Sequence, residues 1–92
     1  MTYARRVDEN QGEVVNAIEK AGGVVTYLYR VGEGVSDLLV SFRQQWLVFE
    51  VKKDARQKLT KPQIDWIGRQ RSPVYVVTSG LEAVQIMQLI KP

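Results

Sequence analysis

Apolar residues recur along this chain at two spacings, and each spacing predicts a different kind of element. Val14, Val15 and Ile18 have the spacing of residues on one face of a helix. Asp8, which precedes them, is suited to the N-cap position of this helix. Runs rich in valine and aromatic residues, bounded by glycine or proline, predict strands instead. The expected elements are a helix over about 9–21, strands over 24–31, 38–42 and 46–52, a helix over about 60–70, a strand over 74–78 and a helix over 79–90.

The order α-β-β-β-α-β-α predicts an α/β fold in which helices flank a mixed sheet. The 92 residues suffice for one domain, 1–92, with a modest core that oligomerisation would help to stabilise. The helix over 60–70 would form a parallel crossover between the third and fourth strands. We expect the fully apolar fourth strand in the centre of the sheet, and Trp46 and Trp66 in the core. The last helix is apolar over a wide arc, which fits either packing on the sheet or a dimer surface.

The composition excludes several kinds of chemistry. The chain has no cysteine and no histidine, which removes disulfides, zinc fingers, thiol nucleophiles and imidazole bases. A metal would have to be bound by oxygen atoms, which favours magnesium, manganese or calcium. No apolar run is long enough to cross a membrane and the N-terminus lacks a signal-peptide core, so we expect a cytoplasmic protein without a membrane partner. The net charge of +3 weakly favours an anionic partner.

Two carboxylates lie on strands that the expected hairpin would pair. Glu50 and Lys52 share one face of the third strand, because alternate residues of a strand point the same way. A two-residue turn after Phe42 would place Asp37 opposite Glu50, whereas a three-residue turn would offset the pair by one position. Carboxylates on paired strands come within roughly 5–8 Å, close enough to share a hydrated cation. Their charge would be balanced either by a metal or by Lys52 alone, in a neutral Asp-Glu-Lys cluster.

Positive charge is concentrated directly after this strand. A run of like charges is by itself usually a solvated loop. Because this run begins in the strand that carries Glu50 and Lys52, it would also suit the binding of DNA phosphates. The cations expected to contact DNA are Lys53, Arg56, Lys58, Lys61 and Arg69.

Three successive motifs resemble those of a known nuclease family. The segments are Gly34-Val35-Ser36-Asp37, Phe49-Glu50-Val51-Lys52 and Leu59-Thr60-Lys61-Pro62-Gln63. In this order, within an α-β-β-β-α-β-α frame, they resemble the VRR-Nuc domain, a branch of the PD-(D/E)xK nuclease superfamily, and especially its small stand-alone phage-type members. The resemblance extends from about residue 8 to residue 89. Ser36 departs from it, because the superfamily has proline at this position.

The resemblance implies a restriction-endonuclease-like core with a metal site at the paired strands. Asp37 and Glu50 match the metal ligands of the family, and the backbone carbonyl of Val51 would complete the metal site. Lys52 matches the catalytic lysine, which would orient the attacking water or stabilise charge on the phosphate. The implied metal is Mg²⁺ or Mn²⁺, one or two ions in number.

Two further matches come from the helices. Gln63 matches the glutamine in the helix after the Glu-x-Lys strand, and Glu13 matches the acidic residue of the first helix, which in this family faces the metal site. Both residues have an ordinary structural alternative. Thr60 and Gln63 form the pattern of a capping box, so Gln63 would serve only to begin a helix. Glu13, like Glu9, would serve as a partner of the helix dipole.

The implied activity is the hydrolysis of DNA phosphodiester bonds by a metal-dependent endonuclease without a small-molecule cofactor. One small domain carries one site, so cutting both strands or resolving a four-way junction would require a symmetric homodimer. We therefore expect a homodimer selective for branched DNA, similar to Holliday-junction resolvases. The alternatives are a nickase or endonuclease on linear duplex, a non-catalytic nucleic-acid-binding module, and an interaction domain that uses the last helix. Tyr27, Tyr29 and Arg30, at the end of the first strand, are either additional DNA contacts or the edge of the core.

Overall fold

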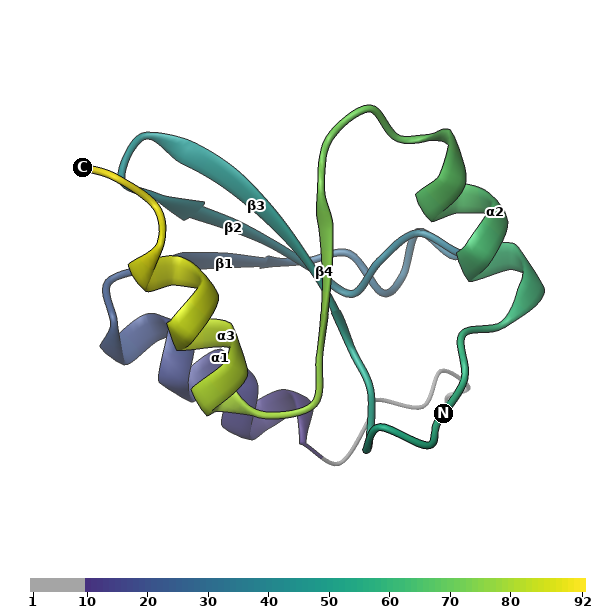
Figure 1. The fold of residues 1–92 in the computed structure, drawn as a ribbon, viewed down its shortest axis with the longest axis horizontal. Coiled ribbons are helices and arrows are strands. Elements are labelled where there is room, and N and C mark those ends of the chain that lie inside the picture. The colour runs from purple at the N-terminus through teal and green to yellow at the C-terminus, as the bar shows by residue number, and fades with distance from the viewer. Residues whose placement is uncertain (1–9) are drawn as a thin grey trace.

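A four-stranded mixed sheet and three helices make up the part of the chain that the structure describes, residues 10–92 (Figure 1). The α/β class and the order of the elements are those predicted from the sequence. In chain order, this computed structural model contains α1 (Gln11–Lys20), β1 (Val24–Tyr27), β2 (Leu38–Phe42), β3 (Gln45–Val51), α2 (Lys61–Arg69), β4 (Val74–Val77) and α3 (Gly80–Gln88).

The strands lie in the order β1-β2-β3-β4. Both β1 and β3 run antiparallel to β2, whereas β4 runs parallel to β3, so α2 belongs to a parallel crossover as predicted. The interior position of β3 agrees with its apolar residues on both faces. The expectation that β4 lies in the centre of the sheet is wrong, because β4 forms an edge and Val76 is 46% exposed. An apolar run indicates burial of a strand but not which strands become its neighbours.

A two-residue turn joins β2 to β3. Phe42 pairs with Gln45, and the residues between them, Arg43 and Gln44, have φ angles of 49° and 66°. Two successive positive φ angles define a type I′ turn, whose twist matches that of the paired strands. The same register pairs Leu38, the first residue of β2, with Phe49, so the residue before Leu38 lies opposite the residue after Phe49. This register is the one that places Asp37 opposite Glu50.

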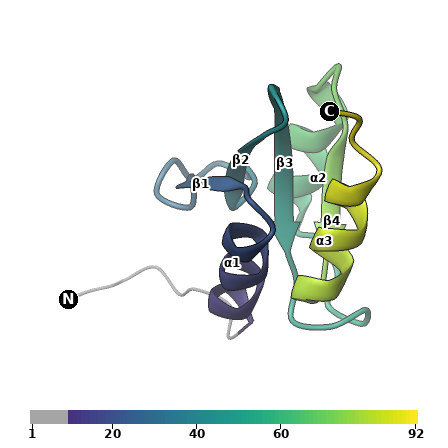
Figure 2. The same cartoon turned by 90° about the vertical axis from the view of Figure 1, so that its left-hand side faces the viewer.

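The core lies between one face of the sheet and the two helices α1 and α3 (Figure 2). The two helices pack closely where they meet, because Gly80 at the start of α3 lies against Ala17 of α1. A Cβ atom added to Gly80 would lie 2.6 Å from the Cβ atom of Ala17. The sheet contributes alternate residues of each strand to the core, as a half-buried strand pattern requires. The fully buried apolar residues are Val14, Ile18, Leu38, Val40, Phe49, Val51, Val77 and Ala83.

The opposite face of the sheet is largely open to solvent. Val24 and Trp46 on this face are 67% and 68% exposed, so the expected burial of Trp46 is wrong. Trp66, expected in the core as well, is half-buried on α2, a helix without a buried residue. The reason is the placement of the helices: α1 and α3 both cover the other face, while α2 approaches this face at the end of β3.

Several element boundaries differ from those predicted, most by one or two residues, and those of α1 and β1 matter most for the site. Asn10 takes the N-cap position of α1, and Asp8 and Glu9 lie outside the described residues. Strand β1 ends at Tyr27 rather than at residue 31, because the backbone turns back and Leu28 N donates to the Asp37 carbonyl at 2.7 Å. Among residues 10–92, no helix combines the length and the apolar character that crossing a membrane requires.

Candidate active site

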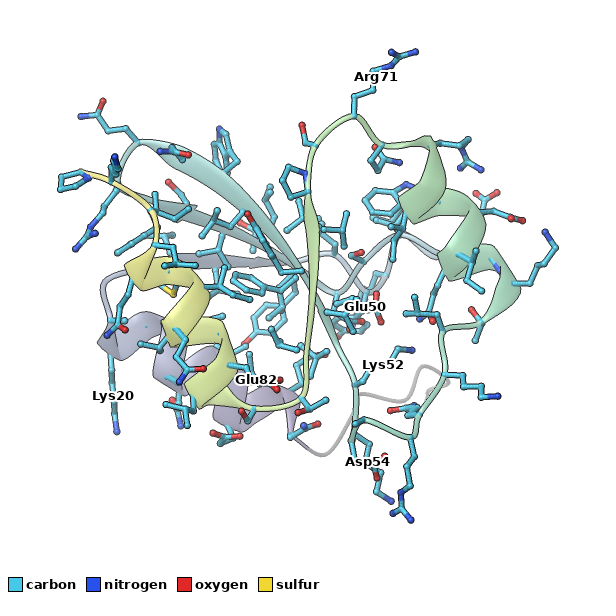
Figure 3. The ribbon with its side chains drawn as sticks, in the orientation of Figure 1. Lys20, Glu50, Lys52, Asp54, Arg71 and Glu82 are labelled. Atoms are coloured by element: carbon cyan, nitrogen blue, oxygen red, sulfur yellow. The ribbon has the colours of Figure 1, made fainter. Side chains whose placement is uncertain are left out.

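Glu50 and Lys52 form a buried ion pair at the end of β3. Glu50 is 2% exposed and Lys52 is 4% exposed, and Lys52 Nζ lies 3.7 Å from Glu50 Oε2. Both side chains extend from β3 toward α2 (Figure 3). A buried ion pair is tolerated when further hydrogen bonds compensate for the lost hydration of the two charges. The surroundings of this pair therefore decide what the site can do.

Asp37 joins the pair from the neighbouring strand. Its Oδ2 atom accepts a hydrogen bond from the backbone N–H of Val51 at 2.8 Å, directly beside Glu50 in the sequence. Asp37 is half-buried and lines a pocket. The two carboxylates predicted from the hairpin register are thus brought together at one end of the sheet.

Gln63 connects α2 to the ion pair. Its side-chain oxygen accepts from Lys52 Nζ at 2.8 Å and from the backbone N–H of Thr60 at 2.9 Å. Its side-chain nitrogen donates to Glu50 Oε2 at 3.1 Å, and its own backbone N–H donates to Thr60 Oγ1 at 3.3 Å. Thr60 and Gln63 therefore form the predicted capping box, and the same glutamine contacts both charges of the pair. The capping interpretation of Gln63 is confirmed, and its part in an active site stays a prediction that these contacts permit.

The loop between β1 and β2 packs against the first turn of α2 through Gly34. Gly34 has a φ angle of 85°, and a Cβ atom there would lie 2.1 Å from the carbonyl oxygen of Pro62. Only glycine fits this contact, since both the backbone conformation and the space exclude a side chain. A pocket of about 300 Å³ opens beside this contact. It is lined by residues of the loop and of α2: Gly32, Glu33, Gly34, Val35, Asp37, Thr60, Pro62 and Gln63.

The oxygen atoms at this end of the sheet suit one hydrated divalent cation. The donors are the carboxylates of Asp37 and Glu50, and Val51, which binds Asp37 through its N–H, would add its backbone carbonyl. Magnesium is usually held by one or two carboxylates and keeps several of its waters, so this set is sufficient for one ion. Residues 10–92 contain no cluster of three or more acidic, histidine or cysteine side chains. Asp37 and Glu50 are thus the two carboxylates that this part of the chain offers to an ion.

Glu13 is not brought to this site. Its Oε2 atom accepts a hydrogen bond from the backbone N–H of Gly80 at 3.0 Å, so the carboxylate occupies the N-terminus of α3. An anion is stabilised there by the exposed N–H groups and the dipole of the helix. Its alternative, Glu9, lies outside the described residues. We leave Glu13 out of the ligand set.

Asn10 is the residue of α1 that does reach the site. Its side-chain nitrogen donates to the carbonyl of Lys52 at 2.9 Å and to that of Thr78, and so ties α1 to the ends of β3 and β4. Sequence analysis missed this contact. The available signal was weak: asparagine is a preferred N-cap residue, but its partners lie 42 and 68 positions away in the sequence.

The five cations expected to contact DNA are all exposed. Two of them take part in surface ion pairs, Arg56 with Asp54 at 3.5 Å and Lys61 with Asp65 at 2.8 Å. Exposed pairs of this kind contribute little to stability, so a phosphate can compete for these cations. The five are distributed over the segment after β3 and along α2: Lys53, Arg56, Lys58, Lys61 and Arg69.

No protein-family model, curated protein or solved structure matches this chain. A functional assignment therefore depends on the geometry of the site and on the motifs that carry it.

Proposed function

We propose that this chain is a metal-dependent endodeoxyribonuclease with a PD-(D/E)xK-type active site and a restriction-endonuclease-like core, similar to VRR-Nuc domains. One observation carries the proposal: the residues of three separate motifs meet in one network around the buried pair of Glu50 and Lys52. Asp37 contacts the backbone beside Glu50, and Gln63 contacts both Glu50 and Lys52. A capping box alone would not require its glutamine to reach a carboxylate and an ammonium group on the neighbouring strand.

Each residue of the network has a defined part in phosphodiester hydrolysis. Asp37, Glu50 and the carbonyl of Val51 would hold the ion. A bound Mg²⁺ or Mn²⁺ lowers the pKa of a coordinated water and polarises the scissile phosphate. Lys52, held by Gln63 at 2.8 Å, would offset the negative charge that develops on the phosphate. Proton transfer through a histidine is not available, because the sequence has none.

The substrate we propose is branched DNA, bound by a symmetric homodimer. One domain carries one such site, so paired cuts at a junction require two copies related by a twofold axis. Exposed cations beside the site support contact with the DNA backbone, which positions a nucleic acid without reading its sequence. Such recognition by shape agrees with a preference for a four-way junction over a particular base sequence. Such an enzyme would work in the cytoplasm.

A second candidate function is a nucleic-acid-binding module without catalysis. The observation that favours it is the ion pair itself, since Lys52 already balances the charge of Glu50 without a metal. This module would bind DNA in a salt-dependent way with or without divalent ions, and would never cut it.

A cleavage assay separates the two candidates. Labelled four-way junction, flap and linear duplex are incubated with Mg²⁺, Mn²⁺ or EDTA, using the parent chain, Asp37→Asn and Glu19→Gln. Asp37→Asn preserves the shape of the side chain and an acceptor for Val51 N–H, but removes the charge that binds a metal. Mutating a residue that only supports the ligands of a metal site typically lowers metal affinity or activity by roughly 10–100-fold. We expect Asp37→Asn, which changes a ligand itself, to lower metal-dependent cleavage by at least this factor.

Glu19→Gln is the matched control, because it neutralises an exposed carboxylate on α1 and should cut like the parent. Cleavage by Asp37→Asn at the rate of the parent would show that the proposed site is wrong. Binding without cleavage under every metal condition would favour the non-catalytic module. Changes to Glu50 or Lys52 alone are less suitable, since breaking a buried ion pair costs about 3–5 kcal/mol of stability.

A further inference from the structure

A second pocket, of about 330 Å³, lies between the N-terminal turn of α1 and the end of β1. We call it the tyrosine pocket. The residues of the described part of the chain that line it are Gln11, Gly12, Tyr27, Tyr29 and Arg30. The space at Gly12 is open, since a Cβ atom there would meet no atom within 4 Å. The pocket therefore has aromatic walls, an open floor and a positive charge at its edge.

The side chains of the pocket are arranged with accessible aromatic surface. The rings of Tyr27 and Tyr29 meet edge to face, with centroids 6.3 Å apart and planes at 85°, so they are not stacked on each other. Tyr27 is 53% exposed although it lies on the core side of the sheet, at the end of β1 that faces the first turn of α1 across the pocket. The position is therefore not the ordinary edge of a core.

Arg30 supplies the charge. Its guanidinium lies 5.8 Å from the centre of the Tyr29 ring, within the range of a cation–π contact, and its Nε atom is 3.5 Å from the Tyr29 hydroxyl. The hydrogen bond to Tyr29 raises the pKa of Arg30, so the guanidinium stays charged. An exposed arginine near the exposed ring of Tyr27 has the charge to contact a phosphate next to a base stacked on that ring.

The tyrosine pocket is linked to the candidate active site by two short connections. Leu28, which separates the two tyrosines, donates its N–H to the carbonyl of Asp37 at 2.7 Å. Asn10, the neighbour of Gln11, donates to the carbonyl of Lys52 at 2.9 Å. Both walls of the pocket are thus held by residues that contact the backbone of the site, at the same end of the sheet.

We propose that the tyrosine pocket holds an unpaired nucleobase of a DNA strand, stacked on Tyr27 with Arg30 on the adjoining phosphate. Aromatic platforms next to a cation bind single strands with little dependence on sequence, because every base has a face that can stack. The inference rests on the proposed function and adds to it the kind of substrate: DNA with unpaired bases, as at a flap or an open junction.

The test measures binding alone, in EDTA, by fluorescence anisotropy of labelled oligothymidylate and of blunt duplex. The double variant Tyr27→Leu/Tyr29→Leu keeps apolar bulk but removes both rings, and Tyr27→Phe/Tyr29→Phe keeps the rings. We expect the leucine variant to bind oligothymidylate about tenfold more weakly, the effect of one lost stacked base, while its affinity for duplex changes by less than about twofold. The phenylalanine variant should bind like the parent.

Trp46→Leu is the matched control, because it removes an exposed ring on the opposite face of the sheet. The proposal is overturned if the leucine variant binds like the parent, if Trp46→Leu weakens binding equally, or if the phenylalanine variant loses binding. It is also overturned if thymidine monophosphate competes as strongly as the oligonucleotide, which would indicate a site for a free nucleotide. Circular dichroism confirms that each variant is folded.

The outcomes for this pocket and for the nuclease are distinguishable. If the parent cuts DNA and the leucine variant binds single strands undiminished, only the pocket proposal fails. If the parent never cuts and the leucine variant still loses single-strand binding, only the nuclease proposal fails.

Discussion

At the scale of single residues, Gln63 couples the start of a helix to the charges of the site. Four hydrogen bonds involve this residue, two with Thr60 and one each with Lys52 and Glu50. The orientation of the amide is fixed by these partners, because its oxygen faces two donors and its nitrogen faces a carboxylate. A substitution of Gln63 therefore affects both the helix cap and the ion pair, whereas a substitution of Thr60 affects the cap alone.

Thr60→Ala and Gln63→Ala separate the cap from the site. Thr60→Ala removes the side-chain acceptor of the cap and should lower the free energy of unfolding by about 1 kcal/mol. Gln63→Ala also leaves the buried Lys52 and Glu50 with fewer partners, so the loss should be roughly 2–4 kcal/mol. Urea denaturation measures both values. In the cleavage assay only Gln63→Ala should lose activity, by about tenfold or more.

An equal loss of activity in both variants would contradict this prediction, since it would mean that Gln63 acts only through the helix.

The residues of the site could be predicted from the sequence where local rules apply. The type I′ hairpin fixes the register that brings Asp37 to Glu50, and the capping box fixes the position of Gln63 at the start of α2. Glu13 shows where such rules end. Its partner, Gly80, is 67 positions away and is reached only because α1 packs on α3, which no local pattern encodes.

At the scale of elements, the loop between β1 and β2 packs directly against the first turn of α2. Three successive residues of this loop, Gly32, Glu33 and Gly34, have positive φ angles. The loop thereby turns its backbone onto the peptide of Pro62, with no side chain between the two segments. This contact positions Gln63, the next residue of α2.

Two glycines of this loop provide a matched pair of substitutions. Gly32→Ala and Gly34→Ala both place a side chain at a positive φ angle, which costs about 1–2 kcal/mol. A Cβ atom at Gly32 meets no atom within 4 Å, whereas at Gly34 it overlaps the carbonyl of Pro62. Gly34→Ala should therefore lose roughly 1–3 kcal/mol more than Gly32→Ala in urea denaturation. Equal losses would show that the loop does not press on α2 as described.

The position of whole elements was harder to predict than their existence. The seven elements follow from apolar spacing, but the edge position of β4 and the exposure of Trp46 do not. Both depend on which face of the sheet α1 and α3 cover. A tryptophan in a largely apolar strand fits a buried face and an open face equally well in sequence, since the pattern records alternation and not what lies opposite.

At the scale of the whole molecule, positive charge gathers on one side. The segment after β3 and helix α2 carry exposed cations, whereas Lys20 lies on α1, away from Lys52 (Figure 3). Each phosphate contact releases bound counterions, so the salt dependence of DNA affinity counts the cations involved. This quantity can be measured without cleavage.

The double variant Arg56→Gln/Lys58→Gln should bind duplex DNA more weakly and with a shallower salt dependence. Removing two phosphate contacts should reduce the slope of log affinity against log salt by about 2. The matched control Lys20→Gln/Lys91→Gln makes the same change in net charge at exposed positions elsewhere. Anisotropy titrations in EDTA at several salt concentrations give both slopes. If the control reduces the slope as much as the test variant, the binding is due to net charge and not to this surface.

Helix α2 buries none of its residues, and this has a consequence for when the site exists. A helix held mainly by polar contacts at one end can unfold locally while the core stays intact. Each such opening would withdraw Gln63 from the two charges of the strand, so we expect an equilibrium between the assembled and open forms. DNA that binds the cations of α2 would favour the closed form, because those cations converge only when the helix is in place. The substrate would then complete the arrangement that acts on it.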